Sequence, residues 1–219
     1  MINNILFDLD GTIINSEAGV TGSIRHALRE CGYPEPAQEE LRKCIGPPLT
    51  ESFRCRFLVP KEDVTRVLKA FRRRYQELGM YECELYPGIV SCLRRVKALG
   101  YGVNLASSKN ERACRTILSH LQIAELFDEI VGSTDSASIE TKQDVIAEYF
   151  RRAPKQIPRE TVLVGDTRFD AEGALLSGMI CFGVTYGFGN AEELKKYGVK
   201  HLFSSPHELE AYFEKYKDQ

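Results

Sequence analysis

The order of strand-like and helix-like segments constrains the fold of this 219-residue chain more than any other feature. Short apolar runs, typical of buried strands, lie at 3–9, 102–107, 129–132, 161–165, 180–184 and 200–203. Segments with helical periodicity separate or follow the later runs, at 88–99, 110–121, 141–152, 169–177, 190–197 and 205–216. This alternation predicts a mostly parallel sheet with helices on both faces.

The connection after the first strand is much longer than a parallel crossover requires. It is almost wholly helical in pattern, with segments at 16–31, 38–44, 48–57 and 60–79. A crossover needs only about a dozen residues. We therefore predict an α/β fold with a Rossmann-like, mostly parallel sheet core, residues 1–15 and 83–219. An all-helical insertion, residues 16–82, interrupts that core, with hinges at Asn15–Glu17 and Glu82–Pro87.

Composition excludes several classes of partner. The chain carries 29 Lys and Arg against 31 Asp and Glu, so its charge does not favour nucleic acid or an anionic membrane. It holds no run of about 18 apolar residues, and its N-terminal stretch lacks the basic region of a signal peptide. Seven cysteines without a C-x-x-C pair indicate free thiols in a reducing compartment. We expect a cytoplasmic protein without nucleic-acid or membrane partners, and leave the oligomeric state open.

Polar side chains follow several of the predicted strands at the point where each strand ends. In open α/β sheets, ligands bind beyond the carboxyl ends of the strands, so these side chains are candidate site residues. The first strand is followed by the sequence FDLDGT, and a later one reads VLVGDTRFD. The candidates are Asp8, Asp10, Ser107, Ser108, Lys142, Asp166 and Asp170.

Four carboxylates at one edge of a sheet would repel one another and have raised pKa values unless a cation neutralised them. Mg²⁺ binds carboxylate and phosphate oxygens, and a lysine with a hydroxyl suits a phosphoryl group. Each residue also has a structural explanation: Ser107 or Asp166 could cap a helix, and Lys142 could be a surface lysine. A calcium loop is excluded, because Ile13 and Gly19 occupy its glycine and glutamate positions. The joint order of these residues favours phosphoryl transfer.

The same residues carry a resemblance to a known family. The chain resembles haloacid dehalogenase-like hydrolases, specifically phosphatases with a helical cap after the first motif, and within them the phosphoglycolate phosphatase-like group. Supporting stretches are IGPPL at 45–49, YPG at 86–88 and VTYGFG at 184–189. Two features differ from that group, the pair Ser107-Ser108 in place of Thr-Asn and ETKQDVI in place of Lys-Pro. The motif residues are Asp8-Leu9-Asp10-Gly11-Thr12, Ser107, Lys142, and Gly165-Asp166 with Asp170.

The resemblance implies a role for each residue. Asp8 is implied as the nucleophile that forms an aspartyl-phosphate, and Asp10 as the general acid and base. Mg²⁺ is implied as the cofactor, bound by Asp8, the backbone carbonyl of Asp10, and Asp166. Ser107, Ser108 and Lys142 are implied as the phosphate-binding residues, and the backbone N–H groups of Gly11 and Thr12 as additional phosphate donors. Asp170 is implied to orient Lys142 or a metal-bound water.

The helical insertion, called the cap below, is expected to determine specificity. By resemblance, Arg72 and Tyr75 in the stretch FRRRYQELG at 71–79 are its candidate substrate contacts. The expected function is Mg²⁺-dependent hydrolysis of a small phosphorylated metabolite such as phosphoglycolate. The alternatives are a nucleotide phosphatase, a pyrophosphatase, a sugar phosphomutase and a receiver-like signalling module. The mutase is disfavoured because Val20 stands where cap-bearing mutases carry histidine.

Overall fold

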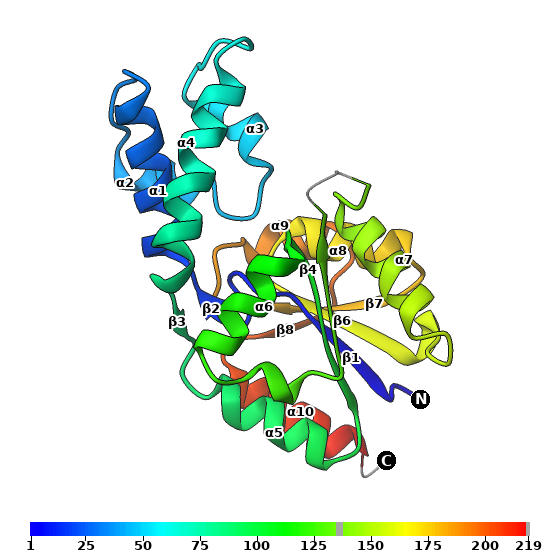
Figure 1. Ribbon diagram of the computed structural model, residues 1–219. Coiled ribbons are helices and arrows are strands. Elements are labelled where there is room, and N and C mark those ends of the chain that lie inside the picture. Colours follow the sequence, from blue (N-terminus) through cyan, green and yellow to red (C-terminus); the bar gives the residue numbers. More distant parts are fainter. Residues whose placement is uncertain (135–137, 218–219) are drawn as a thin grey trace. The chain divides into compact units, whose positions relative to one another are not determined.

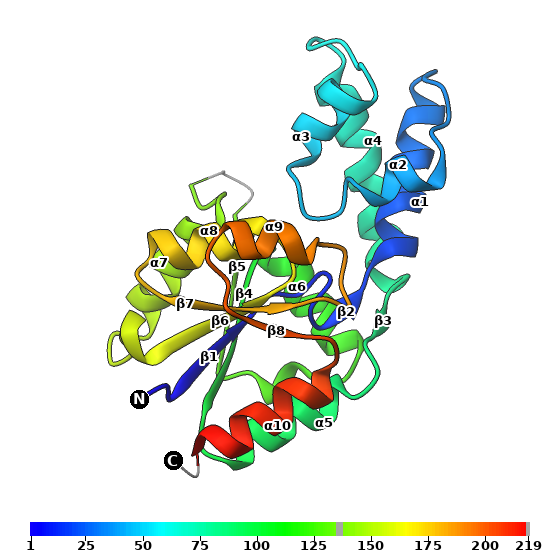
Figure 2. The same ribbon diagram turned by 180° about the vertical axis from the view of Figure 1, so that it is seen from behind.

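The computed structural model describes residues 1–134 and 138–217 (Figures 1 and 2). It divides into two compact units. The core comprises Met1–Ile14 and Leu85–Gln219, and the cap comprises Asn15–Glu84. The limits expected from the sequence differ from these by one or two residues.

The core contains one six-stranded sheet with strand order β5-β4-β1-β6-β7-β8. Every neighbouring pair is parallel, which confirms the predicted α/β fold class. The strands are β1 (Asn4–Phe7), β4 (Gly102–Asn110), β5 (Glu129–Ser133), β6 (Thr161–Gly165), β7 (Ile180–Val184) and β8 (His201–Phe203).

Helices cover both faces of this sheet, as the apolar strands require. All four residues of β1 are buried, which is typical of a strand between two helical layers. Each crossover between parallel strands is right-handed. Helices in connections that step across the sheet in one direction therefore lie on one face, and helices in connections that step in the other direction lie on the opposite face. One layer holds α5 (Ile89–Ala98), α6 (Glu111–His120) and α10 (Pro206–Lys217), with α5 and α10 side by side (Figures 1 and 2). The other holds α7 (Lys142–Arg152), α8 (Arg168–Leu176) and α9 (Ala191–Lys196).

The register of the central strands brings their carboxyl ends to one level. Phe7 pairs with Leu105 of β4 and with Val164 of β6. The next residue, Asp8, donates its backbone N–H to the carbonyl of Val164 at 2.9 Å. The chain then turns back at Gly11, whose φ of 77° favours glycine. The residues after β1, β4 and β6 are therefore neighbours.

Strand β4 runs three residues further than expected, to Asn110. Its pairing with β5 shifts register between Ala106 and Asn110, so this end of the strand is irregular. The side chain of Asn110 accepts hydrogen bonds from the backbone of Arg112 and Ala113 and caps α6. Ser107 and Ser108 thus lie inside the strand rather than in a loop after it.

The cap is helical between its two linkers. Its helices are α1 (Glu17–Glu30), α2 (Gln38–Arg42), α3 (Leu49–Glu51), the π-helix η1 (Ser52–Arg56), α4 (Val64–Glu77) and the 3₁₀-helix η2 (Gly79–Tyr81). The expected helix over 48–57 is split into α3 and η1, and the one over 60–79 begins at Val64 because residues 60–63 form a turn. Two short strands, β2 (Ile14–Asn15) and β3 (Glu84–Leu85), pair where the chain enters and leaves the cap.

Helices α1 and α4 pack closely in the cap. The 3₁₀-helix η2, which follows α4, also approaches α1: a Cβ atom at Gly19 would lie 1.9 Å from the carbonyl oxygen of Gly79, so only glycine allows this approach. Arg74 of α4 donates to the hydroxyl of Ser23 at 3.0 Å and pairs with Glu82 at 2.7 Å. These contacts make the cap a packed unit in its own right.

No described helix is long and apolar enough to cross a bilayer. All seven cysteines are free thiols, and Cys44, Cys92, Cys114 and Cys181 are buried. The core also contains the 3₁₀-helices η3 (Ala124–Leu126) and η4 (Pro158–Glu160).

Candidate active site at the carboxyl ends of the strands

Lys142, the first residue of α7, is a buried cation among carboxylates. Its Nζ lies 2.7 Å from Asp8 Oδ1 and 2.8 Å from Asp170 Oδ1. It also donates to the carbonyl oxygen of Ala106 at 2.9 Å. Burial alone would lower the pKa of Lys142, but the charges of Asp170 and Asp8 raise it above its usual range. Lys142 is therefore a permanent positive charge beside Asp8.

Asp8 lies at the end of β1 with little exposure to solvent. Burial raises the pKa of Asp8 to about 6, against the opposing effect of Lys142, and the charge of Asp170 adds to the rise. A group of this kind is a stronger base than an ordinary surface aspartate. A further cation that approached Asp8 would favour its ionised form.

Asp166 follows β6 and is fully buried. Its Oδ2 accepts hydrogen bonds from the backbone N–H groups of Phe188 at 2.7 Å and Gly189 at 3.2 Å. Its Oδ1 has no hydrogen-bond partner in the part of the chain that is described. Burial, with the charges of Asp170 and Asp8, raises the pKa of Asp166 well above its usual value. One oxygen is thus held by the loop after β7, and the other is left for a ligand.

Asp170 lies in the first turn of α8. Its Oδ2 accepts from the backbone N–H of Thr167 at 3.0 Å and from its hydroxyl at 2.8 Å, in a capping box. Its Oδ1 is the atom that contacts Lys142. The carboxylate is fixed at both ends, and it in turn fixes Lys142.

The acid cluster has the donor set of a divalent-cation site. Asp8, Asp166 and Asp170 each offer an oxygen within 4.8 Å of the others. All three are buried, and one buried oxygen, Asp166 Oδ1, has no hydrogen-bond donor among the described residues. The ammonium of Lys142 does not balance three carboxylates. An oxygen-only donor set with excess negative charge fits a hard cation such as Mg²⁺.

Asp10 stands apart from this cluster. It is partly exposed, and its Oδ1 accepts from Lys109 Nζ at 2.8 Å. Lys109 is not among the candidates that the sequence offered. No sequence signal indicated it, because the predicted strand ends at residue 107, whereas β4 continues to Asn110.

The remaining phosphate-binding candidates have different surroundings. Ser107 is buried, and its hydroxyl oxygen accepts from the backbone N–H of Lys109 at 3.3 Å. Ser108 is exposed at the same end of β4. Thr12 is buried, and no partner of its hydroxyl is present in residues 1–134 and 138–217. Its carbonyl accepts from the Tyr186 hydroxyl at 3.0 Å.

The loop after β7 is a part of the site that the sequence analysis did not assign. Phe188 and Gly189 act through backbone N–H groups, which no side-chain pattern reveals. The stretch VTYGFG was noted only as a supporting resemblance.

The two cap candidates differ in exposure. Arg72 is exposed on α4, where it lines a shallow surface hollow with Lys69 and Gln76. Tyr75 is buried inside the cap and stacks on Phe71, with ring centroids 5.4 Å apart.

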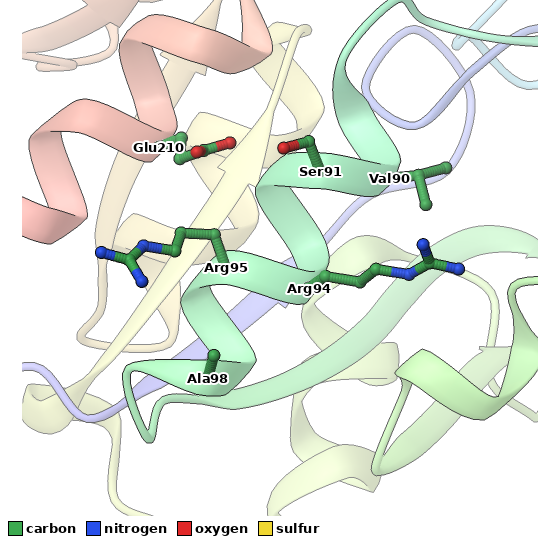
Figure 3. Close-up of a pocket in the computed structure, with 6 residues that line it drawn as sticks. All are labelled: Val90, Ser91, Arg94, Arg95, Ala98 and Glu210. Carbon is green, nitrogen blue, oxygen red and sulfur yellow. The ribbon is translucent and has the colours of Figure 1, made fainter.

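A second shallow hollow lies on the core between α5 and α10 (Figure 3). Ser91 and Glu210 point toward one another across it, and Arg94 extends away. None of the site residues named above lines it. The acid cluster, rather than this hollow, is the candidate active site.

Comparisons with known proteins agree with this geometry. The sequence pattern of the haloacid dehalogenase-like hydrolase family matches residues 5–184. A 5'-nucleotidase of Pseudomonas aeruginosa is 31% identical over 198 residues, which are 90% of this chain and 89% of that protein. A phosphoglycolate phosphatase of Escherichia coli O157:H7 is 27% identical over 224 residues, covering 88% of this chain and 85% of that protein.

Other relatives have related architectures but different names. The tyrosine-protein kinase PtkA of Mycobacterium tuberculosis is 33% identical over 192 residues, covering 88% of this chain. This chain spans only 65% of the length of PtkA. Among solved structures, the haloacid dehalogenase-like family protein SP0104 of Streptococcus pneumoniae superposes with a TM-score of 0.90 at 31% identity. That match covers 97% of this chain and 98% of SP0104.

The family pattern covers most of the core and all of the cap, including the residues of the acid cluster. The resemblance seen in the motifs is confirmed: the chain belongs to the haloacid dehalogenase-like hydrolase family.

Proposed function

We propose that this protein is a Mg²⁺-dependent phosphatase that hydrolyses phosphomonoesters of small metabolites through an aspartyl-phosphate on Asp8. The observation that supports it most directly is the buried Asp8, paired with Lys142 beside the acids Asp166 and Asp170. A carboxylate so placed can be a nucleophile, because Lys142 and a cation held by the acids would neutralise the negative charge of an incoming phosphoryl group.

In the first half-reaction, an oxygen of Asp8 forms a bond to phosphorus, and the bond from phosphorus to the ester oxygen breaks. Asp10 gives its proton to the departing alcohol oxygen. In the second half-reaction, a water oxygen attacks the same phosphorus and the bond to Asp8 breaks. Asp10 takes the proton of that water, so that inorganic phosphate leaves and both aspartates return to their starting state.

The other residues bind the phosphoryl group and the cofactor. Lys142, the Ser107 hydroxyl and the Ser108 backbone N–H would bind phosphoryl oxygens, with Thr12 as a further donor. Mg²⁺ would be held by Asp8, Asp166 and the backbone carbonyl of Asp10. When bound, it neutralises charge on the transferring group. Asp170 also contacts the Lys142 ammonium and keeps it in place beside Asp8.

The substrate class proposed is a small phosphomonoester, either a phosphoglycolate-like acid or a nucleoside 5'-monophosphate. Relatives named for each activity match almost the full length of this chain. A mutase reaction is disfavoured because Val20 is an apolar, buried residue of α1.

The test is phosphate release from p-nitrophenyl phosphate with and without Mg²⁺. We expect turnover that a chelator abolishes, and at least a thousandfold loss in Asp8→Asn, on the order of the loss when a catalytic nucleophile is removed. The variant must keep the thermal unfolding of the wild type to be informative. Chelator-resistant turnover, or undiminished rates in Asp8→Asn, would contradict the proposal.

The substrate class is tested by a screen of phosphorylated metabolites that includes phosphoglycolate, nucleoside monophosphates, pyrophosphate and sugar phosphates. Arg72→Ala is compared with Arg29→Ala, since both arginines are exposed cap residues. We expect Arg72→Ala to raise KM for the preferred substrate and Arg29→Ala to leave it unchanged. Equal kinetics in the two variants would remove Arg72 from the specificity site.

A further inference from the structure

Lys109 has an environment that a surface lysine does not have. Only 11% of its side chain is exposed, and its ammonium lies 2.8 Å from Asp10 Oδ1, whose side chain is 17% exposed. Holding the lysine side chain in one partly buried conformation costs conformational entropy and hydration. An ordinary exposed ion pair stabilises a protein too little to offset this cost.

The backbone of Lys109 is fixed by its neighbours in the core. The thiol of Cys114 donates to the Lys109 carbonyl oxygen at 3.6 Å. A Cβ atom at Gly132 would lie 2.5 Å from that same oxygen, so β5 can approach only because residue 132 is glycine. The next residue, Asn110, caps α6. The ammonium therefore reaches Asp10 from a rigid support.

Each of the two aspartates of the first motif has its own lysine. Lys142 contacts Asp8, and shares its charge with Asp170. Lys109 contacts Asp10, whose carboxyl group lies outside the group of three acids that suits a cation. A cation held, as proposed above, by Asp8, Asp166 and the Asp10 carbonyl would contact the backbone of Asp10 and would not orient its side chain. Lys109 is placed to do so.

We propose that Lys109 is a positioning residue for Asp10 in the hydrolysis of the aspartyl-phosphate, an inference that rests on the proposed function. Its hydrogen bond fixes the Asp10 carboxylate through Oδ1, so that the carboxylate is held where it accepts a proton. In that step the water oxygen bonds to phosphorus, the bond from phosphorus to Asp8 breaks, and the water proton passes to Asp10. Lys109 itself exchanges no proton and makes no covalent bond.

The two half-reactions depend on Asp10 differently when the leaving group is good. p-Nitrophenolate departs with little need of protonation, so formation of the aspartyl-phosphate from p-nitrophenyl phosphate needs Asp10 only weakly. Hydrolysis of the intermediate still requires a base aimed at water. Loss of Lys109 should therefore slow the second step and spare the first.

The experiment compares wild type, Lys109→Met, Lys109→Arg and Lys97→Met in rapid-quench kinetics with p-nitrophenyl phosphate and Mg²⁺. Lys97 is the control for an exposed lysine–aspartate pair, because its ammonium lies at the same distance, 2.8 Å, from Asp128, with 37% of its side chain exposed. We expect Lys109→Met to slow hydrolysis of the phosphoenzyme by about 10- to 100-fold, the order of effect that a misplaced catalytic group produces. Its formation should change by less than about threefold, so that a burst of p-nitrophenol appears. Lys109→Arg should restore most of the hydrolysis rate, and Lys97→Met should match the wild type.

A double-mutant cycle with Asp10→Asn distinguishes an effect of Lys109 on the position of Asp10 from a general disturbance of the structure. If Lys109 acts through Asp10, Lys109→Met should have no further effect on hydrolysis in the Asp10→Asn background. This comparison uses ratios within each background, so it remains valid if Lys109→Met is less stable.

Several results would overturn the inference. A parallel fall of both steps would indicate structural damage, and a rise in KM alone would make Lys109 a substrate contact. Additive effects in the cycle would show that it does not act through Asp10. A wild type that forms no phosphoenzyme would contradict the proposed function itself. Unchanged kinetics in Lys109→Met, with a working wild type, would contradict only the role of Lys109.

Discussion

Asp166 shows how much of this site depends on single glycine residues around one carboxyl group. A Cβ atom at Gly11 would lie 2.1 Å from Asp166 Oδ2. A Cβ atom at Gly187 would lie 2.2 Å from the Gly11 carbonyl oxygen and 2.4 Å from Asp166 Oδ2. The loop after β7 therefore has to approach without side chains at this point. Only then can Phe188 and Gly189 donate their N–H groups to Asp166.

Gly187→Ala is expected to displace Asp166 and to weaken Mg²⁺ binding, because the new methyl group would overlap the Gly11 carbonyl oxygen and the Asp166 carboxylate. Loss of such a supporting contact typically costs 10- to 100-fold in metal affinity. The stabilisation by excess Mg²⁺ should then fall by about 1.4–2.7 kcal/mol. The measurement is the unfolding free energy with and without Mg²⁺.

The matched control is Gly22→Ala on α1, where the new Cβ would meet only the end of the Arg74 side chain, at 3.3 Å. This variant should keep the full response to Mg²⁺. An equal response in Gly187→Ala would show that the loop does not set the position of Asp166.

Helix α7 is the element that delivers Lys142 to the site, and it is held at both ends. Its first turn has a capping box between Thr141 and Asp144. In its last turn, Arg152 contacts a glutamate of α6, one of β5 and one of α7 itself. These are Glu111 at 2.9 Å, Glu129 at 3.3 Å and Glu148 at 2.7 Å. Such a network fixes the helix relative to the sheet, and with it the buried lysine.

The ion pairs at the end of α7 should give a pH-dependent stability. Hydrogen bonds from Arg151 and Arg152 lower the pKa of Glu148 from its ordinary 4.5 to about 2. Because this pKa is lowered on folding, its stabilisation is present above about pH 4.5 and is lost as the pH falls toward 2. At neutral pH we expect Glu148→Gln to cost about 0.5–1 kcal/mol, since the pairs are partly screened by solvent.

Urea unfolding at pH 7, 4 and 3 measures this difference, with the exposed Glu172→Gln of α8 as control. The gap between wild type and Glu148→Gln should narrow with acid, and Glu172→Gln should show little gap at any pH. A gap that widens with acid would be opposite to the expected sign.

The chain builds its catalytic and helical units from separate stretches of sequence. The core sheet is complete without Asn15–Glu84, and the cap has its own packed interface between α1 and α4. The two linkers pair as β2 and β3, so the points where the chain leaves and re-enters the core are about one strand spacing apart, roughly 5 Å. The insertion can thus be removed without opening the sheet.

A variant with a short Gly-Ser linker in place of Asn15–Glu84 should fold and unfold cooperatively, because every core strand and helix is retained. We expect it to keep Mg²⁺-dependent turnover of p-nitrophenyl phosphate and to lose discrimination among metabolites. Circular dichroism and the substrate screen provide the measurements. The control is the full chain with the same linker inserted at the exposed turn after Gly32. A capless core that does not fold, beside a folded control, would refute this division of roles.

The local sequence pattern was sufficient to predict the α/β class, the six core strands and the acidic residues at the strand ends. Burial on both faces makes each strand a continuous apolar run, and a carboxylate directly after such a run is conspicuous. The split of the expected helix over 48–57 and the extension of β4 to Asn110 were not readable, since element ends depend on packing and hydrogen bonds.

The pairing of Lys109 with Asp10, the support of Asp166 by Phe188 and Gly189, and the burial of Tyr75 came only from the folded chain. These contacts join residues 22 to 99 positions apart or depend on which face of a helix is covered. The periodicity of a segment predicts which of its residues are buried. The partners of backbone N–H groups and of charged side chains depend instead on which distant segments come into contact in the folded chain. The sequence therefore identified the chemical groups of the site, and the packing of the chain assigned their partners.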